Sequence, residues 1–407
     1  FPAFGDSQTR AIGTPDEGKT SWAEGDELLL VIDNTFYGKQ YATFTYNDKS
    51  WKLTSGELVY REGDPAYIPH VYYAPNYKWE AGKLVLKEGK DPGTDEYIEG
   101  NARITGNSET ITVSFAEATR KYSRLRIATL PNEQITVDTE YFTPAGSSDM
   151  EQEGNYTLTS DEKGNAYLYG TFENNSEVTV KYREAALTTH TFSQATESAK
   201  SYALDATVIS ANSAEEIKSA IEQKVADGKT TIRLNLAPNA GTDEFMAIRE
   251  AIKGAAPNDE GTIELTIIGV ETIPEEAFKR MSQLKSVKMP DVKEIKKYAF
   301  SECQYLTVVE APSLNKLNSG AFNECYLLSK LTFGPINYAD ARYWQIFEDI
   351  TPNIDLILSD YQKEMIETDD NLYTANNDID YADSNKHWNK NFLGREFKSI
   401  TCRFKVE

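Results

Sequence analysis

The pattern that decides the fold reads IPEEAF at residues 273–278, IKKYAF at 295–300 and LNSGAF at 317–322, a step of 22 residues each time. Other apolar columns keep the same step, and they are Met281, Cys303 and Cys325; Leu284, Leu306 and Leu328; and Val287, Val309 and Leu331. Each repeat is expected to form one short strand and one compact return, which bury their apolar columns only against the neighbouring coils.

This repeat, I-x-x-x-A-F-x-x-C-x-x-L-x-x-V-x-x-P, resembles the BspA-like leucine-rich repeats found on bacterial cell surfaces, and Cys303 and Cys325 occupy the family's usual cysteine position. The resemblance covers residues 270–334, and a partial strand at 262–267 precedes them. It implies an α/β leucine-rich-repeat solenoid with 22-residue repeats. The second domain is therefore assigned to residues 206–407, with the repeats themselves at 262–334.

The residues around the repeats are interpreted as caps, because an open solenoid end would expose its core columns. The N-terminal α/β cap at 206–261 is predicted to contain a helix from a capping box at Ser213 and Glu216 to Gly228, a strand at 231–236 and a helix from Thr242 to Gly254. The C-terminal cap at 335–407 is predicted to contain strands at 354–358 and 398–404, Trp344, Trp388 and a surface loop at 369–385.

Residues 1–205 show no helical stripe, and their short alternating segments are separated by turn residues, as in an antiparallel sandwich. The predicted strands are 27–32, 43–46, 66–73, 110–115, 135–142, 166–172 and 177–182. Residues 194–210, rich in Ser, Ala and Thr, are interpreted as the linker to the second domain.

An ordered set of short motifs in this first domain resembles the N-terminal part of the fimbrillin (Mfa-like) family. The motifs are TRA at 9–11, WAEGD at 22–26, LLL at 28–30, FTY at 44–46 and YYAP at 72–75. The resemblance implies an all-β, transthyretin-like sandwich. The chain as a whole is thus predicted to be multidomain, with this sandwich followed by the solenoid.

Composition excludes several classes of function. The 407 residues include 42 Lys and Arg against 64 Asp and Glu, and the resulting net charge of −22 opposes binding to the phosphate backbone of nucleic acids. The longest strongly apolar run, at 28–32, is far shorter than the roughly 18 residues of a membrane-spanning helix. We therefore expect no nucleic-acid partner and no membrane span in this chain.

No residue pattern points to catalysis, a cofactor or a metal ion. His70, His190 and His387 are isolated in the sequence, without partners at the spacing of a metal site. The acidic run at 376–380 lacks the glycine and the glutamate that complete a calcium loop. We therefore assign no catalytic, cofactor-binding or metal-binding residue, and we predict a protein that is not an enzyme.

Two further groups of residues have structural explanations. Cys303 and Cys325 share a column with Met281, so buried free thiols are favoured over a disulfide between neighbouring coils. Several aromatic residues of the first domain could stack on a sugar, but such residues more often fill a sandwich core. They are Trp22, Trp51, Tyr72, Tyr73 and Trp79.

The repeats offer a candidate binding surface. Side chains alternate along a strand, so if Val287 and Met289 point into the core, then Ser286 and Lys288 point outward. Together with the equivalent positions of the other coils they form an open surface, termed the strand face, of a kind that solenoids commonly use for partners. Its predicted members are Glu264, Thr266, Ser286, Lys288, Val308, Glu310, Lys330 and Thr332.

The two resemblances imply a protein of the cell surface or outer membrane of a Gram-negative bacterium, held by a lipid anchor on a segment that this chain does not contain. The expected function is adhesion or recognition, with host or bacterial surface proteins or glycans bound by the strand face. Two alternatives stay open. One is an accessory or tip subunit of a fimbria-like fibre, which joins other fimbrial subunits by donor-strand exchange. The other is a glycan-binding or glycan-processing accessory protein.

Overall fold

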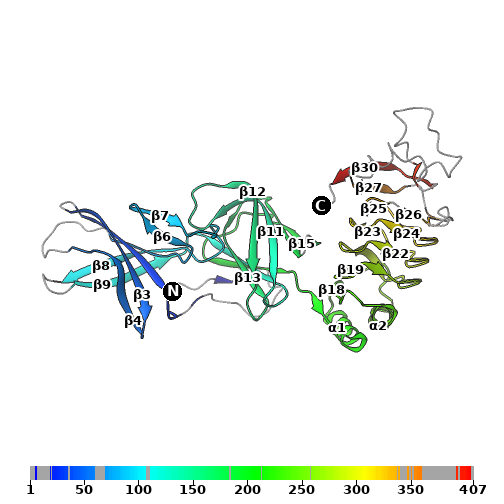
Figure 1. Cartoon of the computed structure of the whole chain (residues 1–407), viewed down its shortest axis with the longest axis horizontal. Coiled ribbons are helices and arrows are strands. Elements are labelled where there is room, and N and C mark those ends of the chain that lie inside the picture. Colours follow the sequence, from blue (N-terminus) through cyan, green and yellow to red (C-terminus); the bar gives the residue numbers. More distant parts are fainter. Residues whose placement is uncertain are drawn as a thin grey trace, which may run out of the picture. The chain divides into compact units, whose positions relative to one another are not determined.

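The computed structural model describes residues 5–6, 19, 21–34, 37–59, 69–106, 111–182, 185–211, 213–256, 258–336, 338–339, 346–347, 350, 353–359, 391–392 and 395–404. The chain divides into two compact units, Phe1–Thr207 and Val208–Glu407. The described residues form mostly strands, together with the helices α1 and α2 (Figure 1).

The first unit begins with an antiparallel sheet in the order β4-β3-β2-β5-β8-β9. Its strands are β2 (Glu27–Asn34), β3 (Gly38–Asn47), β4 (Ser50–Gly56), β5 (His70–Tyr73), β8 (Ile98–Gly106) and β9 (Ile111–Thr119). Alternation along β2 places Leu28 and Leu30 in one apolar cluster and Leu29 in a second. The hairpin of β6 (Tyr77–Glu80) and β7 (Lys83–Leu86) contributes to the second cluster.

A second sheet completes this unit, in the order β1-β16-β10-β13-β11-β14-β15, with β12 paired to β11. Its strands are β1 (Gly5–Asp6), β10 (Ser123–Ala128), β11 (Gln134–Pro144), β12 (Glu151–Thr159), β13 (Asn165–Phe172), β14 (Glu177–Tyr182), β15 (Ala185–Thr191) and β16 (Lys200–Asp205). β10 pairs antiparallel with β13 and parallel with β16. The predicted segments at 135–142, 166–172 and 177–182 are therefore all strands of one sheet.

The interpretation of residues 194–210 as a linker is wrong, because β16 lies within them and pairs with β10. Leu204 is the one residue of this strand that is buried, so the segment lacks the apolar alternation that marks a strand in the sequence. The strand is specified by its partners on the sheet and not by its own pattern.

The second unit is built on a parallel sheet in the order β17-β18-β19-β21-β23-β25-β27-β30. Its strands are β17 (Ile209–Ser210), β18 (Thr231–Asn235), β19 (Ile263–Ile268), β21 (Leu284–Lys288), β23 (Val308–Ala311), β25 (Lys330–Phe333), β27 (Asp355–Ser359) and β30 (Ser399–Phe404). The column of Val287, Val309 and Leu331 lies in register across this sheet, as the step of 22 residues predicts.

On the other side of each coil, short strands form a separate parallel sheet in the order β20-β22-β24-β26 (Figure 1). They are β20 (Thr272–Ile273), β22 (Glu294–Ile295), β24 (Lys316–Leu317) and β26 (Tyr338–Ala339). The pair β28 (Asn391–Phe392) and β29 (Arg395–Glu396) is antiparallel. Apolar columns between the two parallel sheets belong to one continuous buried cluster, as expected for coils that bury their surface only against each other.

Two helices precede the repeats, as the sequence predicts. α1 (Ala214–Ala226) begins after Ser213, whose hydroxyl accepts a hydrogen bond from the backbone N–H of Glu216 at 3.3 Å. α2 (Thr242–Ala255) begins after Gly241, whose N–H donates to Glu244 Oε2 at 2.8 Å. Ile217 and Ile221 of α1 and Phe245 of α2 are buried in the same cluster as the repeat columns.

A row of phenylalanine rings runs through this core. Phe278, Phe300 and Phe322 stack with centroid separations of 5.2 and 5.5 Å. The row continues beyond the repeat motif to Phe245 of α2 at one end and to Phe347 and Phe397 at the other. The cap residues thus complete the same column that the repeats begin.

Candidate functional site

The parallel register brings the predicted strand-face residues together in two rows. Each row runs across β19, β21, β23 and β25, which follow one another in the sheet (Figure 1). One row holds Glu264, Ser286, Val308 and Lys330, and the other holds Thr266, Lys288, Glu310 and Thr332.

Both rows extend beyond the predicted residues at each end. The added members are Thr231 and Arg233 in β18, Asp355 and Ile357 in β27, and Ser399 and Thr401 in β30. Sequence reasoning missed them because β18 precedes the repeat motif and the step from Lys330 to Asp355 exceeds 22 residues. The strands predicted at 231–236, 354–358 and 398–404 were the available signal for this extension.

The accessible charges on and beside the two rows balance. Arg233 is only 7% exposed, so the accessible charges of the rows are two basic side chains, Lys288 and Lys330, and three acidic ones, Glu264, Glu310 and Asp355. The third acidic charge is balanced by Lys285 beside the rows, whose Nζ lies 2.8 Å from Glu264 Oε1. Lys288 Nζ lies 3.4 Å from Glu310 Oε2, and Lys330 Nζ lies 4.0 Å from Glu310 Oε1. On a chain with a net charge of −22, the rows are therefore locally neutral.

Most of the face is accessible to solvent. The side chains of Lys288, Glu310 and Lys330 are 42%, 30% and 45% exposed. Thr266 differs from the expectation, because it is only 5% exposed. Its neighbours in the row are Arg233 and Lys288, whose long side chains can cover a threonine. The accessible face therefore lacks Thr266.

A bulge adds a further column beside the rows. The register of β21 shifts at Lys285, whose Nζ donates to Glu264 Oε1 at 2.8 Å, and this hydrogen bond raises the pKa of the ammonium group. Thr307 and Ser329 occupy the same column in the next two coils. Their hydroxyls donate to the carbonyl oxygens of Lys285 and Thr307, at 2.8 and 3.0 Å. The same period of 22 residues, applied to polar positions, would have identified this column.

The two cysteines of the repeats are free and buried, as predicted. Their Sγ atoms donate to the carbonyl oxygens of Phe278 and Phe300, at 3.0 Å from Cys303 and 3.1 Å from Cys325. Burial raises the pKa of the Cys303 thiol to about 12. Both thiols therefore pack as small apolar groups and are not poised as nucleophiles.

The aromatic residues of the first unit fill its cores, as predicted. Trp22, Trp51 and Tyr73 pack in the cluster around Leu28, whereas Tyr72 and Trp79 belong to the cluster around Leu29. The Trp22 and Trp51 rings meet edge to face, with centroids 4.8 Å apart. Because these residues divide between two clusters, they do not form a single stacking platform.

The histidines have ordinary surroundings where they are described. His70 Nδ1 lies 3.6 Å from Glu99 Oε1, and burial lowers the pKa of His190. His387 and the acidic run at 376–380 lie outside the described residues. Within the described part of the chain, no cluster of three or more His, Cys, Asp and Glu residues has the geometry of a metal site. Neither described helix has the length and apolar character that a membrane crossing requires.

The fold and its two-row face define a repeat protein with a parallel, solvent-exposed sheet. A family model described as the BspA type leucine rich repeat region matches residues 262–360 in six copies. The match continues past residue 334, and in the structure β27 continues the parallel ladder there by pairing with β25. Searches of curated proteins and of solved structures gave no match to the chain.

Proposed function

We propose that this chain is a non-enzymatic adhesion or recognition protein of a bacterial cell surface, which binds a surface protein of a host or another bacterium through the strand face. The observation that carries the proposal is a neutral, exposed double row on a chain of net charge −22. The net negative charge of the chain opposes the approach of acidic partners, and a face with balanced charges lowers that repulsion locally. Repeats of this type are in general protein-interaction modules.

The dimensions of the face favour a protein partner over a small ligand. Neighbouring strands lie about 4.8 Å apart, so the rows from β18 to β30 extend about 29 Å. That length is comparable to the width of a standard protein interface of about 800 Å² per partner. Exposed ion pairs contribute at most about 1 kcal/mol each, so single contacts are weak and many copies on one surface would act together.

The test is a binding screen of the whole chain against an array of host matrix proteins and mucin-type glycans. The strand-face variant Lys288→Ala, Glu310→Ala, Lys330→Ala should lose signal about tenfold on the protein ligands. Its matched control, Glu271→Ala, Lys293→Ala, Lys316→Ala, removes the same types of charge beside the second parallel sheet and should bind like the parent. Absence of any protein ligand, or equal loss in both variants, would count against the proposal.

We further propose that the protein belongs to the outer membrane surface of a Gram-negative bacterium, where a lipid on a segment outside this chain anchors it. Support comes from the resemblance of the repeats to cell-surface repeats and of the first domain to fimbrillins. Protease treatment of intact cells of the source bacterium, followed by immunoblotting, tests this. Loss of the protein from intact cells is expected, and full protection would place it inside.

One observation favours a second candidate, a subunit of a fimbria-like fibre. β1 pairs parallel with β16 through two positions, Gly5 with Lys200 and Asp6 with Ser201, and the opposite edge of β16 pairs with β10. If β1 leaves, the outer edge of β16 becomes available to a strand of another copy. The resemblance to fimbrillins points in the same direction.

A variant that begins after Arg10, a residue outside the described ranges, tests this candidate. Size-exclusion chromatography with light scattering should show a concentration-dependent ladder of oligomers for the shortened chain and a single species for the parent. A shortened chain that stays monomeric at all concentrations would reject donor-strand assembly.

A further inference from the structure

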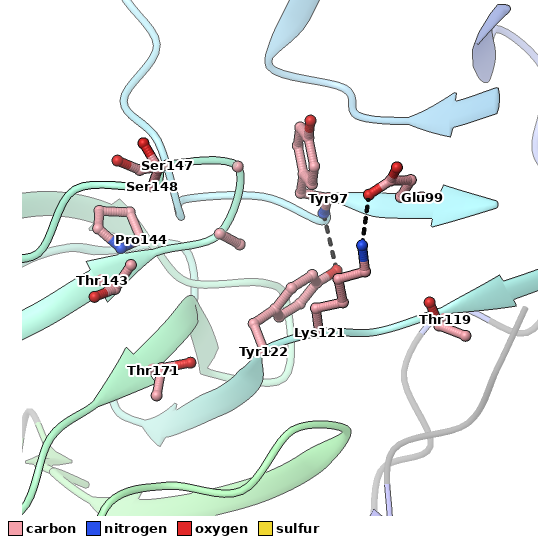
Figure 2. Close-up of a pocket in the computed structure, with 12 residues that line it drawn as sticks. Tyr97, Glu99, Thr119, Lys121, Tyr122, Thr143, Pro144, Ser147, Ser148 and Thr171 are labelled. Carbon is pink, nitrogen blue, oxygen red and sulfur yellow. Dashed lines mark hydrogen bonds and ion pairs between the residues drawn. The ribbon is translucent and has the colours of Figure 1, made fainter. Parts of the chain in front are cut away.

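The first unit contains a half-open crevice of about 320 Å³ between its two large sheets (Figure 2). Tyr97, Glu99 and Thr119 line it from the first sheet and its approach. Thr143, Thr171 and the turn that follows β11 line it from the second. The segment that connects β9 to β10 lies between these walls, so residues distant in the sequence share one cavity.

The lining is rich in groups that both donate and accept hydrogen bonds. Seven of the twelve lining residues carry a hydroxyl group, and all seven are labelled in Figure 2. The hydroxyls of Tyr122, Ser147 and Ser148 already donate within the chain, to Glu96 or to Asp149. The groups that offer a donor and two acceptor positions to a ligand are therefore the hydroxyls of Tyr97, Thr119, Thr143 and Thr171. Such a lining complements a ligand that is itself a polyol, and the ring of Tyr97 adds an apolar surface beside the hydroxyls.

The charges in the crevice cancel. Lys121 and Glu99 are the charged residues of the lining, and Lys121 Nζ lies 3.0 Å from Glu99 Oε2. Glu99 Oε1 faces His70 Nδ1 at 3.6 Å. The crevice therefore has no excess charge to attract a phosphate or a cation, and a neutral ligand suits it best.

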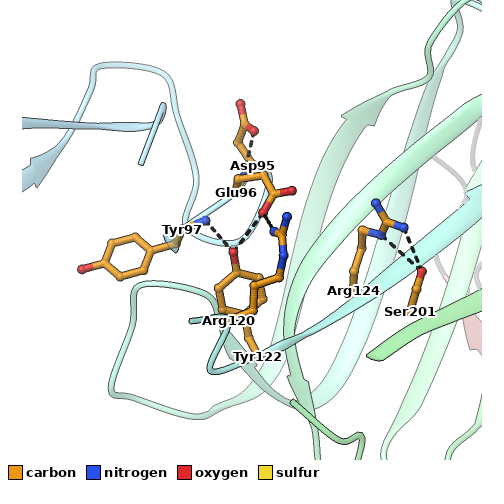
Figure 3. A network of polar contacts seen from close by, with 7 residues as sticks. All are labelled: Asp95, Glu96, Tyr97, Arg120, Tyr122, Arg124 and Ser201. Carbon is orange, nitrogen blue, oxygen red and sulfur yellow. Dashed lines mark hydrogen bonds and ion pairs between the residues drawn. The ribbon is translucent and has the colours of Figure 1, made fainter. Parts of the chain in front are cut away.

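A buried polar network behind the crevice holds one wall in place (Figure 3). Tyr122 Oη accepts a hydrogen bond from the backbone N–H of Tyr97 at 2.9 Å and donates to Glu96 Oε2 at 3.1 Å. The same carboxylate pairs with Arg120, and Glu96 and Arg120 are each only 4% exposed. These contacts fix the approach to β8 against the segment that leads into β10.

Close packing holds the opposite wall. Gly146 has φ +87°, and a Cβ atom there would lie 2.7 Å from Tyr97 Cδ2 and 2.6 Å from Tyr77 Oη. The turn after β11 therefore packs directly on Tyr77 of β6 and on Tyr97, which precedes β8, and only glycine permits this approach. Both walls are thus preformed in the free protein, and this preorganisation reduces the entropic cost of binding.

We propose that this crevice binds the terminal sugar of a neutral glycan. Ligand pockets begin at about 300 Å³, so the crevice accommodates roughly one or two sugar rings. The site lies in the first unit and is independent of the strand face, so it adds a second recognition function to the one proposed above. Carbohydrate binding here needs no catalytic group.

The experiment is saturation-transfer NMR on the whole chain with free glucose, galactose, mannose, fucose, N-acetylglucosamine and N-acetylgalactosamine, followed by calorimetry on those that respond. At least one sugar should bind with a dissociation constant in the millimolar range. The variant Thr143→Val, Thr171→Val removes two hydroxyls from a cross-strand pair in the crevice without changing side-chain size, and it should weaken binding roughly tenfold.

The matched control is Thr179→Val, Thr189→Val, a cross-strand threonine pair of the same sheet with Oγ1 atoms 2.9 Å apart, outside the crevice. This control should bind as the parent does. The proposal is overturned if no sugar gives saturation transfer, if the crevice variant binds as well as its control, or if N-acetylneuraminic acid binds more tightly than every neutral sugar. Each of these results leaves the strand-face proposal untouched.

Discussion

At the scale of single residues, the stacked ring of Phe300 is the most sensitive position in the repeats. Its neighbours Phe278 and Phe322 lie on both sides, at centroid distances of 5.2 and 5.5 Å, and all three rings are fully buried. Phe300→Ala should lower the free energy of unfolding by about 3–5 kcal/mol, because it empties a site that the neighbouring coils cannot fill.

Guanidinium denaturation monitored by circular dichroism measures this change. Leu327→Ala, at a side chain that is 53% exposed, is the control and should change stability by less than about 0.5 kcal/mol. Equal midpoints for the parent and Phe300→Ala would contradict the stacked column.

The buried thiols give a second prediction at this scale. A Cys402→Ser variant leaves Cys303 and Cys325, which should not react with Ellman's reagent at neutral pH while the chain is folded but should both react in denaturant. Rapid labelling of the folded protein would contradict burial.

The same burial predicts how stability depends on pH. The pKa of Cys303 rises from 9.0 to about 12 on folding, so the unfolded thiol ionises first as the pH increases. The free energy of unfolding should therefore fall as the pH rises from 9 toward 12.

At the scale of elements, the ion pair of Glu96 and Arg120 connects the approach to β8 with the approach to β10. Glu96→Gln leaves the buried guanidinium opposite a neutral amide, so we expect a loss of about 3 kcal/mol in stability. Differential scanning calorimetry measures it. The exposed pair of Lys78 and Glu80 supplies the control, because Glu80→Gln should cost less than about 1 kcal/mol. Equal melting curves for the two variants would show that the network does not hold these elements.

The sequence predicts elements best where a strong local signal exists. The period of 22 residues places β21, β23 and β25, and the capping residue Ser213 places the start of α1. β16 could not be predicted, because its residues are mostly half-buried and so show no apolar alternation. Its position depends on pairing with β10, which lies far away in the sequence. The sequence predicts the strand of β27 but not its place in the ladder, because the connection before it is longer than in the other repeats.

The same distinction applies to the sites. The strand face follows from alternation and period, and the register of β19, β21, β23 and β25 places all eight predicted residues in its two rows. Thr266 is the one of the eight that is buried. The crevice could not be predicted, because its walls combine residues near 97, 120, 145 and 171 that only the folded sheets bring together. No local motif marks such a constellation.

At the scale of the whole molecule, the chain combines two units with separate apolar cores. A net charge of −22 keeps copies of the chain apart by repulsion. A locally neutral face for proteins and a neutral crevice for sugars would then act as two weak sites on one chain, whose combined affinity exceeds that of either.

The most direct test of the central claim is lysine footprinting of the whole chain, alone and with the protein ligand that the array identifies. Lys288 and Lys330 on the strand face are 42% and 45% exposed, and Lys285 in the column beside it is 52% exposed. Lys293 and Lys316 at the second parallel sheet, 53% and 39% exposed, serve as internal controls. If the strand face binds the partner, acetylation of the first three should fall severalfold while the two controls stay unchanged. Equal protection of both groups, or protection of the controls alone, would contradict binding through the strand face.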